Sequence, residues 1–154
     1  AMNMKSSIWL IVFIVILSAC TPPESAKVSY IASEEFKKAG LPFSEVVIVG
    51  NMMYLSGQVG SSADNPMKLV EGGIREEAKQ ALDNIKKVLE KNGSSMENVV
   101  KCTVMLADIN EWGEFNKEYV KYFPGDKPAR SAFATNGLAL NARVEIECVA
   151  VLKK

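Results

Sequence analysis

The segment KPARSAFATNGLALNARVEIECVAVL (residues 127–152) contains an arginine, Arg130, close to its start and ends in an apolar run that carries acidic side chains. From Arg143 onward the side chains alternate with a period of two, which indicates a β-strand. One face of this strand is apolar and is expected to lie on the core: Val144, Ile146, Cys148, Ala150 and Leu152. The other face mixes charges with valines: Arg143, Glu145, Glu147, Val149 and Val151. Such a face suits neither open water nor a private core, and it would suit a sheet surface covered by another subunit.

The composition is that of an ordinary globular domain. The chain has 154 residues, of which 48% are hydrophobic and 23% charged, enough for one domain with a modest core. Lys plus Arg and Asp plus Glu each number 18, so nucleic acid binding would lack its usual electrostatic contribution. There is no histidine, which excludes histidine triads, histidine metal sites and a histidine general base. The sequence contains no metal, nucleotide or flavin motif, and no cofactor or metal is expected.

The first residues have the pattern of a bacterial lipoprotein signal peptide (residues 1–19). Lys5 precedes an apolar run that ends in LSAC, a sequence that resembles the lipobox. On this interpretation Cys20 is acylated and begins the mature chain, residues 20–27 form a tether, and residues 28–154 form the domain. The alternative is an uncleaved N-terminal anchor, although the apolar run is short for a bilayer. Both interpretations predict a lipid-anchored or membrane-anchored protein of the cell envelope, outside the cytoplasm.

The segments before the first long helix predict a strand-rich region. Two β-rich runs, at residues 45–49 and 52–56, flank a Gly-Asn dipeptide (residues 50–51) that suits a tight hairpin turn. Residues 28–40 indicate a short strand followed by a helical turn. Residues 61–73 are expected to be loop.

Two amphipathic helices and a strand follow. Residues 74–91 predict a helix that lies on a sheet, with this inward face: Ile74, Ala78, Ala81, Leu82, Ile85, Val88 and Leu89. Residues 99–106 alternate as a strand, with this inward face: Val100, Cys102, Val104 and Leu106. The second helix ends before Pro124 and has this expected inward face: Ile109, Trp112, Phe115, Tyr119 and Phe123.

This order of elements predicts an α+β domain with two helices on one face of a mixed β-sheet. A strand, helix and strand joined by short connections require at least one parallel pair. Cys102 and Cys148 both fall on inward strand positions and are expected to act as small buried hydrophobes. They could form a disulfide only if the strands place them close enough.

Taken together, these stretches resemble the reactive intermediate deaminase family, also called Rid or YjgF. The resemblance covers about residues 46–153 and holds as ordered blocks at consistent spacing. The blocks that carry it are PARSAF (128–133) with VEIECVAV (144–151), PFSEVVIVGNMMYLSGQVG (42–60), QALDNIKKVLE (80–90) and VVKCTVMLADINEWGEFNKEYVKYF (99–123).

The resemblance implies a fold, an assembly and a reaction. The implied fold is the chorismate-mutase-like α+β fold, assembled as a homotrimer with sites at the subunit interfaces. The implied reaction is the cofactor-free hydrolysis of small 2-imino acids and their enamine tautomers. The products of 2-iminobutanoate and 2-iminopropanoate would be 2-keto acids and ammonia.

The resemblance assigns the two main site residues. Arg130 would hold the substrate carboxylate, which its planar guanidinium matches with two hydrogen bonds while remaining charged. By arginine's general habits, a structural ion pair with a glutamate is the alternative. Glu145 would position or activate the attacking water, because a carboxyl of raised pKa can take a proton and then return it to the departing nitrogen. Spacing alone does not separate Glu145 from Glu147, which lies on the same face.

Further residues are implied as substrate-binding. Asn116 and Ser56 would hydrogen-bond near the substrate, although a solvated helix residue and a strand-end hydroxyl are the ordinary alternatives. Backbone amides at or near Ala132 would point at the carboxylate. The chain departs from the pattern at Phe43, where the best-known deaminases have a tyrosine that reaches the site. It also has Ala132 where a cysteine is sometimes found.

Two other functions compete with the deaminase hypothesis. A non-catalytic module that binds small carboxylates at the cell envelope would need Arg130 but not Glu145. Endoribonuclease activity, ascribed to some members of the family, is disfavoured by zero net charge and the lack of histidine. The expected partners are therefore a small 2-imino acid or another small carboxylate, further copies of the chain, and the membrane through the lipid.

Overall fold

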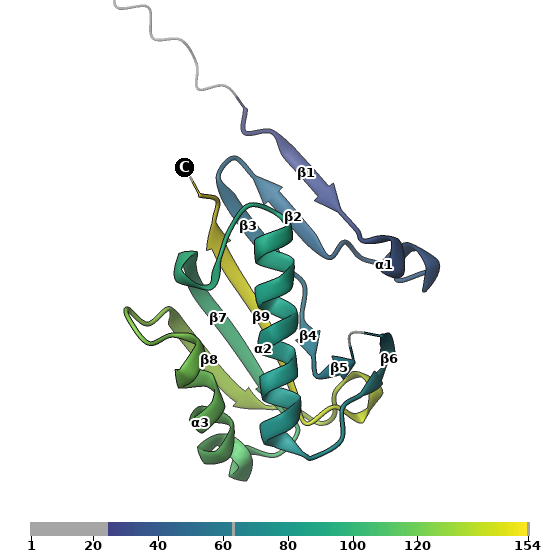
Figure 1. Cartoon of the computed structure of the whole chain (residues 1–154), viewed down its shortest axis with the longest axis vertical. Coiled ribbons are helices and arrows are strands. Elements are labelled where there is room, and N and C mark those ends of the chain that lie inside the picture. The colour runs from purple at the N-terminus through teal and green to yellow at the C-terminus, as the bar shows by residue number, and fades with distance from the viewer. Residues whose placement is uncertain (1–24, 63, 154) are drawn as a thin grey trace, which may run out of the picture.

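The computed structural model describes residues 25–62 and 64–153 (Figure 1). The predicted signal peptide and Cys20 lie outside these residues. The helices and strands in chain order are β1 (Val28–Ile31), α1 (Glu34–Lys38), β2 (Val46–Val49), β3 (Met52–Leu55), β4 (Gln58–Val59), β5 (Ser61–Ser62), β6 (Asn65–Leu69), α2 (Ile74–Lys91), β7 (Val99–Leu106), α3 (Trp112–Tyr122), β8 (Ala129–Ala134) and β9 (Val144–Val151). Within the described part of the chain, no helix is both long enough and apolar enough to cross a bilayer.

One mixed sheet forms the centre of the domain. Its strands lie in the order β1-β2-β3-β9-β7-β8, and β4 also pairs with β9. Strands β7 and β8 are parallel, whereas the other pairs of this sheet are antiparallel. Helix α3 makes the crossover between the two parallel strands, and α2 and α3 lie on the same face of the sheet (Figure 1). The expected α+β fold is confirmed, and so is its parallel pair.

The core lies between this sheet face and the two helices. The whole inward face expected for α2 is buried, because its apolar side chains recur at helical spacing. On β9 the apolar face is buried as predicted. Val144, Ile146 and Ala150 are fully buried, and Cys148 is 2% exposed. The hairpin is also confirmed, since β2 and β3 pair around Gly50, which has a φ of 61°. These elements set the direction of every side chain discussed below.

Two predictions about strands were wrong. Val100 is 43% exposed and Val99 is buried, because the register of β7 against β9 shifts between Val99 and Lys101. Such a bulge inserts one residue and reverses the alternation before it. Residues 61–73 are not all loop, since β5 and β6 form a separate two-stranded sheet. Strand β5 has only two residues and β6 contains a proline, so neither has the sequence pattern of a strand.

The prediction for the start of the second helix was also wrong. Phe115, Tyr119 and Phe123 are buried, but Ile109 and Trp112 are 44% and 38% exposed. The α-helical spacing begins only at Trp112, because a 3₁₀ turn precedes it and changes the rotation per residue. Trp112 therefore lies at the start of α3, with its ring near Arg130 on the edge strand β8.

A buried carboxylate ties α2 to the start of β9. Glu77 is 6% exposed, and its Oε2 accepts a hydrogen bond from the backbone N–H of Arg143 at 2.8 Å. The Arg143 guanidinium in turn pairs with Glu111. Burial raises the pKa of Glu77, and the hydrogen bond and the charge of Arg143 oppose that rise.

Glu77→Gln and Glu77→Ala are expected to differ in stability. The alanine leaves the Arg143 N–H without its acceptor and should cost about 1–3 kcal/mol of unfolding free energy, whereas glutamine keeps an acceptor. Because the folded protein holds the Glu77 proton more tightly than the unfolded chain, wild-type stability should fall as pH rises through this pKa. The glutamine variant should lose that part of the fall. Urea unfolding at pH 4.5 and pH 7, at one protein concentration, measures both effects; equal destabilisation by both substitutions would contradict the hydrogen-bond role.

Candidate functional site

Arg130 lies on the edge strand β8, and its side chain reaches helix α3. Its Nη1 donates a hydrogen bond to Asn116 Oδ1 at 2.8 Å. Its guanidinium carbon lies 4.6 Å from the centre of the Tyr119 ring, and 5.8 and 5.9 Å from those of Phe115 and Trp112. Aromatic faces attract a cation at such distances. One amide and three rings therefore hold the guanidinium at the edge of the sheet.

The guanidinium has no acidic partner in the described part of the chain. None of the ion pairs found there includes Arg130, which is nevertheless half-buried. The structural ion pair considered from the sequence therefore finds no support within one chain. A guanidinium offers five N–H donors, and only one is used by Asn116. The remaining donors suit a planar two-oxygen anion such as a carboxylate.

Buried side chains of the core lie next to the Arg130 guanidinium. Tyr119 is 5% exposed, and its burial raises the pKa of its hydroxyl. Cys102 and Cys148 are register partners on β7 and β9, and both are buried free thiols. Opposed residues of an antiparallel pair have Cα atoms about 4.5–5.5 Å apart, which lies within the range that disulfides span. The expected burial of both cysteines is confirmed.

Glu145 lies on β9 and packs over Gly57. A Cβ atom built on Gly57 would lie 1.9 Å from Glu145 Oε1, so only glycine leaves room for this carboxyl position. Burial raises the pKa of Glu145, and the charge of Glu147 adds to the effect. A raised pKa suits a carboxyl that must both accept and donate a proton. Glu145 is half-buried and Glu147 is exposed, a difference that sequence spacing could not show.

Arg130 and Glu145 point to opposite faces of the sheet. Arg130 contacts α3, so it lies on the helix side. Glu145 alternates with the buried Val144 and Ile146 and therefore lies on the face away from the helices. Their strands are separated by β7, which adds about 10 Å across the sheet. The structure thus does not bring the two residues together within one chain.

Two of the other predicted site residues, Asn116 and Ala132, lie near Arg130. Asn116 joins Arg130, and Ala132 follows on the same strand, half-buried against the core. Because the N–H of Thr135 donates to Leu106 on β7, alternation turns the N–H of Ala132 toward the open edge of β8. That edge is where a bound carboxylate could accept it.

Ser56 directly precedes Gly57, over which Glu145 packs, whereas the aromatic contact of Phe43 is with Phe36 on α1. The Ser56 hydroxyl donates to the Ser44 carbonyl at 2.7 Å, just before Gly57 in the chain. Phe43 is 48% exposed and packs edge-on against Phe36, with ring centres 5.7 Å apart. Sequence reasoning missed Gly57, although a glycine between two strands indicates a close approach of some other group.

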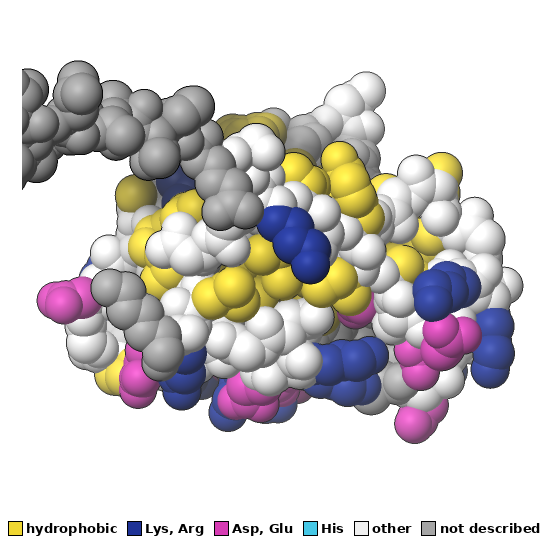
Figure 2. Space-filling view, turned by 90° about the horizontal axis from the view of Figure 1, so that it is seen from above, with side chains coloured by type: hydrophobic (Ala, Val, Ile, Leu, Met, Phe, Trp, Pro, Cys, Tyr) yellow, Lys and Arg dark blue, Asp and Glu magenta, His cyan; other side chains and the backbone are white. Residues whose placement is uncertain are grey.

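The sheet face away from the helices carries exposed apolar side chains. Tyr54 on β3 and Phe133 on β8 are 46% and 47% exposed, and Val149 and Val151 on β9 are half-buried. Figure 2 looks down on the top end of the molecule in Figure 1 and shows hydrophobic side chains in a band across that end, with charged side chains along one rim. These exposed apolar side chains would suit the covering subunit that the alternation of β9 predicts.

Metal ligands do not cluster in the described part of the chain, where no group of three or more Cys, Asp or Glu side chains could hold an ion.

Comparison with known proteins gives consistent results. The sequence profile described as Endoribonuclease L-PSP matches residues 33–152. The chain is 45% identical over 117 residues to Protein HMF1 of Saccharomyces cerevisiae, covering 76% of this chain and 89% of that protein. It is 46% identical over 109 residues to the 2-iminobutanoate/2-iminopropanoate deaminase of Rattus norvegicus, covering 71% and 79%.

The fold is likewise shared with a solved structure. The crystal structure of the yeast protein YEO7 superimposes with a TM-score of 0.76 at 42% identity, over 82% of this chain and 100% of that one. A profile match across most of the chain and relatives above 40% identity agree with the resemblance of the sequence blocks. The chain therefore belongs to the Endoribonuclease L-PSP family, which is also known as the YjgF or Rid family.

Proposed function

We propose that this protein hydrolyses small 2-imino acids, such as 2-iminobutanoate and 2-iminopropanoate, to 2-keto acids and ammonia without a cofactor. The observation that carries the proposal is the Arg130 guanidinium, which is half-buried, held by Asn116 and Tyr119, and without an acidic partner in the described residues. That environment suits the carboxylate of a small substrate. Relatives about 45% identical carry the name 2-iminobutanoate/2-iminopropanoate deaminase, which supports the same reaction.

The proposed mechanism uses Glu145 in two steps. In the first step the carboxylate accepts a proton from water as the water oxygen attacks C2 of the protonated imine, giving a neutral carbinolamine. In the second step the carboxyl returns that proton to the nitrogen, and the C–N bond breaks to release ammonia. The carboxylate takes the proton of the carbinolamine hydroxyl as the C=O bond of the 2-keto acid forms. Burial raises the pKa of Glu145, which makes its carboxylate a stronger proton acceptor in the first step. Arg130 fixes the substrate through its carboxylate, which places C2 for attack.

We propose further that each site forms between two copies of the chain in a homotrimer. Arg130 and Glu145 face opposite sides of one sheet, so one chain cannot place both beside a single small substrate. A second copy that docks its apolar sheet face near the first copy's β8 edge would bring its Glu145 to Arg130. The exposed Tyr54 and Phe133 supply apolar surface for such a contact.

The test of the reaction is ammonia release from imines generated in place by an amino acid oxidase. Protein that begins at Thr21 should accelerate release above the spontaneous rate, with 2-iminobutanoate and 2-iminopropanoate as the substrates. No acceleration over the blank would overturn the proposed reaction. Size-exclusion chromatography with light scattering on the same sample should give three times the mass of one chain.

Gly57→Ala is expected to lower kcat without unfolding the protein. The new methyl group would overlap the Glu145 carboxyl and force it into another rotamer. A displacement of about 1 Å at a reacting group can cost about a hundredfold in rate. Gly113→Ala on α3 is the matched control, because a Cβ there meets no atom within 4 Å. Unchanged kcat in the Gly57 variant would show that the observed position of Glu145 is not the productive one.

We propose finally that Cys20 is lipidated and that the domain lies in the bacterial cell envelope, as the LSAC sequence indicates. Cys20→Ala in the full chain should abolish incorporation of labelled palmitate and move the protein from the membrane to the soluble fraction. Cys102→Ala is the matched control and should keep the label. Persistent labelling of the Cys20 variant would contradict this assignment.

A further inference from the structure

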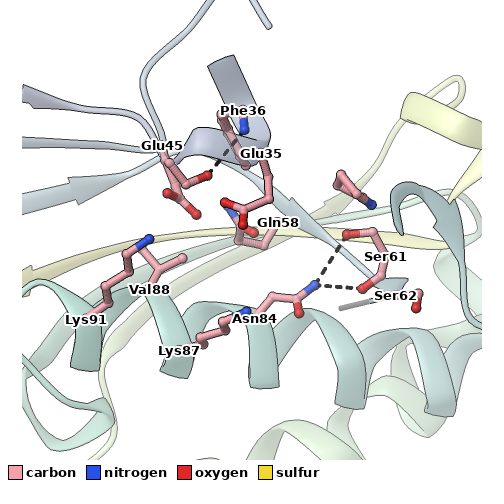
Figure 3. Close-up of a pocket in the computed structure, with 12 residues that line it drawn as sticks. Glu35, Phe36, Glu45, Gln58, Ser61, Ser62, Asn84, Lys87, Val88 and Lys91 are labelled. Carbon is pink, nitrogen blue, oxygen red and sulfur yellow. Dashed lines mark hydrogen bonds between the residues drawn. The ribbon is translucent and has the colours of Figure 1, made fainter. Parts of the chain in front are cut away.

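A mixed-charge cavity lies on the helix side of the sheet, away from both Arg130 and the apolar sheet face. Its volume is about 310 Å³, and it lies among α1, β4, β5 and α2 (Figure 3). Arg130 lies on β8, at the opposite edge of the sheet from β1, the strand that precedes α1. The cavity is therefore a separate place from the proposed catalytic site.

The walls of the cavity carry opposite charges. Glu35 on α1 and Glu45, just before β2, line one side, and Lys87 and Lys91 on α2 line the other. Figure 3 shows the two carboxylates above α2 and the two lysine side chains extending from that helix. None of the ion pairs in the described part of the chain involves these four residues. Two positive and two negative groups thus face one volume without neutralising each other directly.

The floor between the charges is polar and held in place. Asn84 Nδ2 donates to the Val59 and Ser61 carbonyls at 3.2 and 3.0 Å, and Gln80 Nε2 donates to Asn84 Oδ1 at 2.9 Å. Gln58 is 8% exposed and faces the cavity from β4. These contacts fix α2 against β4, so the lysines project from a rigid wall.

The charges on both walls select the ligand class. A simple anion would meet two glutamates and a simple cation would meet two lysines, so each would gain little. A small molecule with one carboxylate and one ammonium group can pair with both walls. Cavities of about 300 Å³ and above hold small ligands. The pKa of Glu35 is lowered first by hydrogen bonds from its own backbone and from Ser33, and to a smaller degree by the charges of Lys91 and Lys87.

We propose that this cavity binds a free zwitterionic amino acid, with its carboxylate toward Lys87 and Lys91 and its ammonium toward Glu35 and Glu45. Its floor strand, β4, pairs with β9 at Glu145, since Val59 and Glu145 are register partners. Amino acids are also the compounds whose oxidation yields 2-imino acids. The cavity would therefore bind the parent compound of the proposed substrate. This binding does not depend on the proposed reaction.

The test is calorimetric titration with L-serine and L-threonine, carried out on the Arg130→Ala protein so that the Arg130 site does not contribute. Lactate, which lacks the ammonium, and ethanolamine, which lacks the carboxylate, should bind at least about tenfold more weakly, because each loses one charged contact. Lys87→Gln with Lys91→Gln should weaken serine binding by at least about tenfold. Lys86→Gln with Lys153→Gln removes two charges from outside this cavity and should leave the affinity unchanged.

Three results would overturn the proposal. The first is no binding of either amino acid at about 10 mM, a concentration that would detect even a weak site. The second is binding that the Lys87 and Lys91 substitutions do not affect, which would place the amino acid elsewhere. The third is inorganic phosphate binding as tightly as serine, which would make the cavity a simple anion site. Because ammonia release is not measured, failure here and failure of the deaminase reaction are distinguishable.

Discussion

Arg130→Ala should lower kcat/KM for 2-iminobutanoate by about a hundred- to a thousandfold, because removing one partner of a buried charge pair costs about 2–5 kcal/mol. Arg130→Lys should recover only part of the loss, since an ammonium keeps the charge but not the planar pair of donors. The fold should survive, because the side chain contacts α3 only through Asn116 and three aromatic rings. Initial rates of ammonia release across a range of imine concentrations measure the effect.

The matched control for this prediction is Arg75→Ala. Arg75 is exposed on α2 and pairs with Glu114, so its removal takes away one guanidinium and leaves the candidate site intact. Surface ion pairs of this kind contribute about 0–1 kcal/mol to stability, and activity should stay near wild type. If Arg130→Ala and Arg75→Ala have equal activity, Arg130 does not hold the substrate.

The substitution Glu145→Gln distinguishes the deaminase hypothesis from the hypothesis of a non-catalytic binding module. In the proposed mechanism, glutamine cannot accept the proton of the attacking water, so catalysis should stop while Arg130 still binds a carboxylate. Thermal stabilisation by 2-ketobutanoate should therefore persist in the glutamine variant and disappear in Arg130→Ala. If wild type itself shows no catalysis but keeps this stabilisation, the protein is a carboxylate-binding module, and Phe43 in place of tyrosine is the first residue to exchange.

The helix α2 and the strand β9 could be predicted from the sequence because each has a long, regular apolar pattern. Their buried faces follow directly from periods of 3.6 and 2. The inward face of β7 was predicted wrongly at Val100, because a bulge is set by how two strands pair and leaves no mark in either strand alone. Ile109 was misplaced for a similar reason. Residue types alone do not show where a 3₁₀ turn gives way to an α-helix, so the inward face was extended too far toward the N-terminus.

The residues of the candidate site could be predicted from the sequence, but their arrangement in space could not. The face on which Glu145 lies followed from alternation, whereas the reach of Arg130 toward α3 depends on the parallel pairing of β8 with β7. The fit of Glu145 over Gly57 depends on β4 pairing with β9, which brings together residues almost ninety positions apart in the chain. Glu77 was missed as a buried residue because a charged side chain on a helix is normally solvated.

Mixed assemblies of two inactive variants should regain activity if each site joins two chains. In a ring of three copies that contains both Arg130→Ala and Glu145→Gln chains, one contact always joins an intact Arg130 to an intact Glu145. Purified mixed trimers should therefore have about one third of wild-type activity, although each variant alone is inactive. The reason lies in the sheet itself, which directs the two side chains to opposite faces.

Coexpression of the variants with two different affinity tags, followed by purification on both tags, isolates the mixed trimers. Differently tagged copies of Arg130→Ala alone are the matched control and should stay inactive, because every contact then lacks its guanidinium. Activity in the doubly purified sample requires that Arg130 and Glu145 act from different chains, since no single chain there carries both. A doubly purified sample that remains as inactive as the control would mean that both residues act within one chain, or that only one of them belongs to the site.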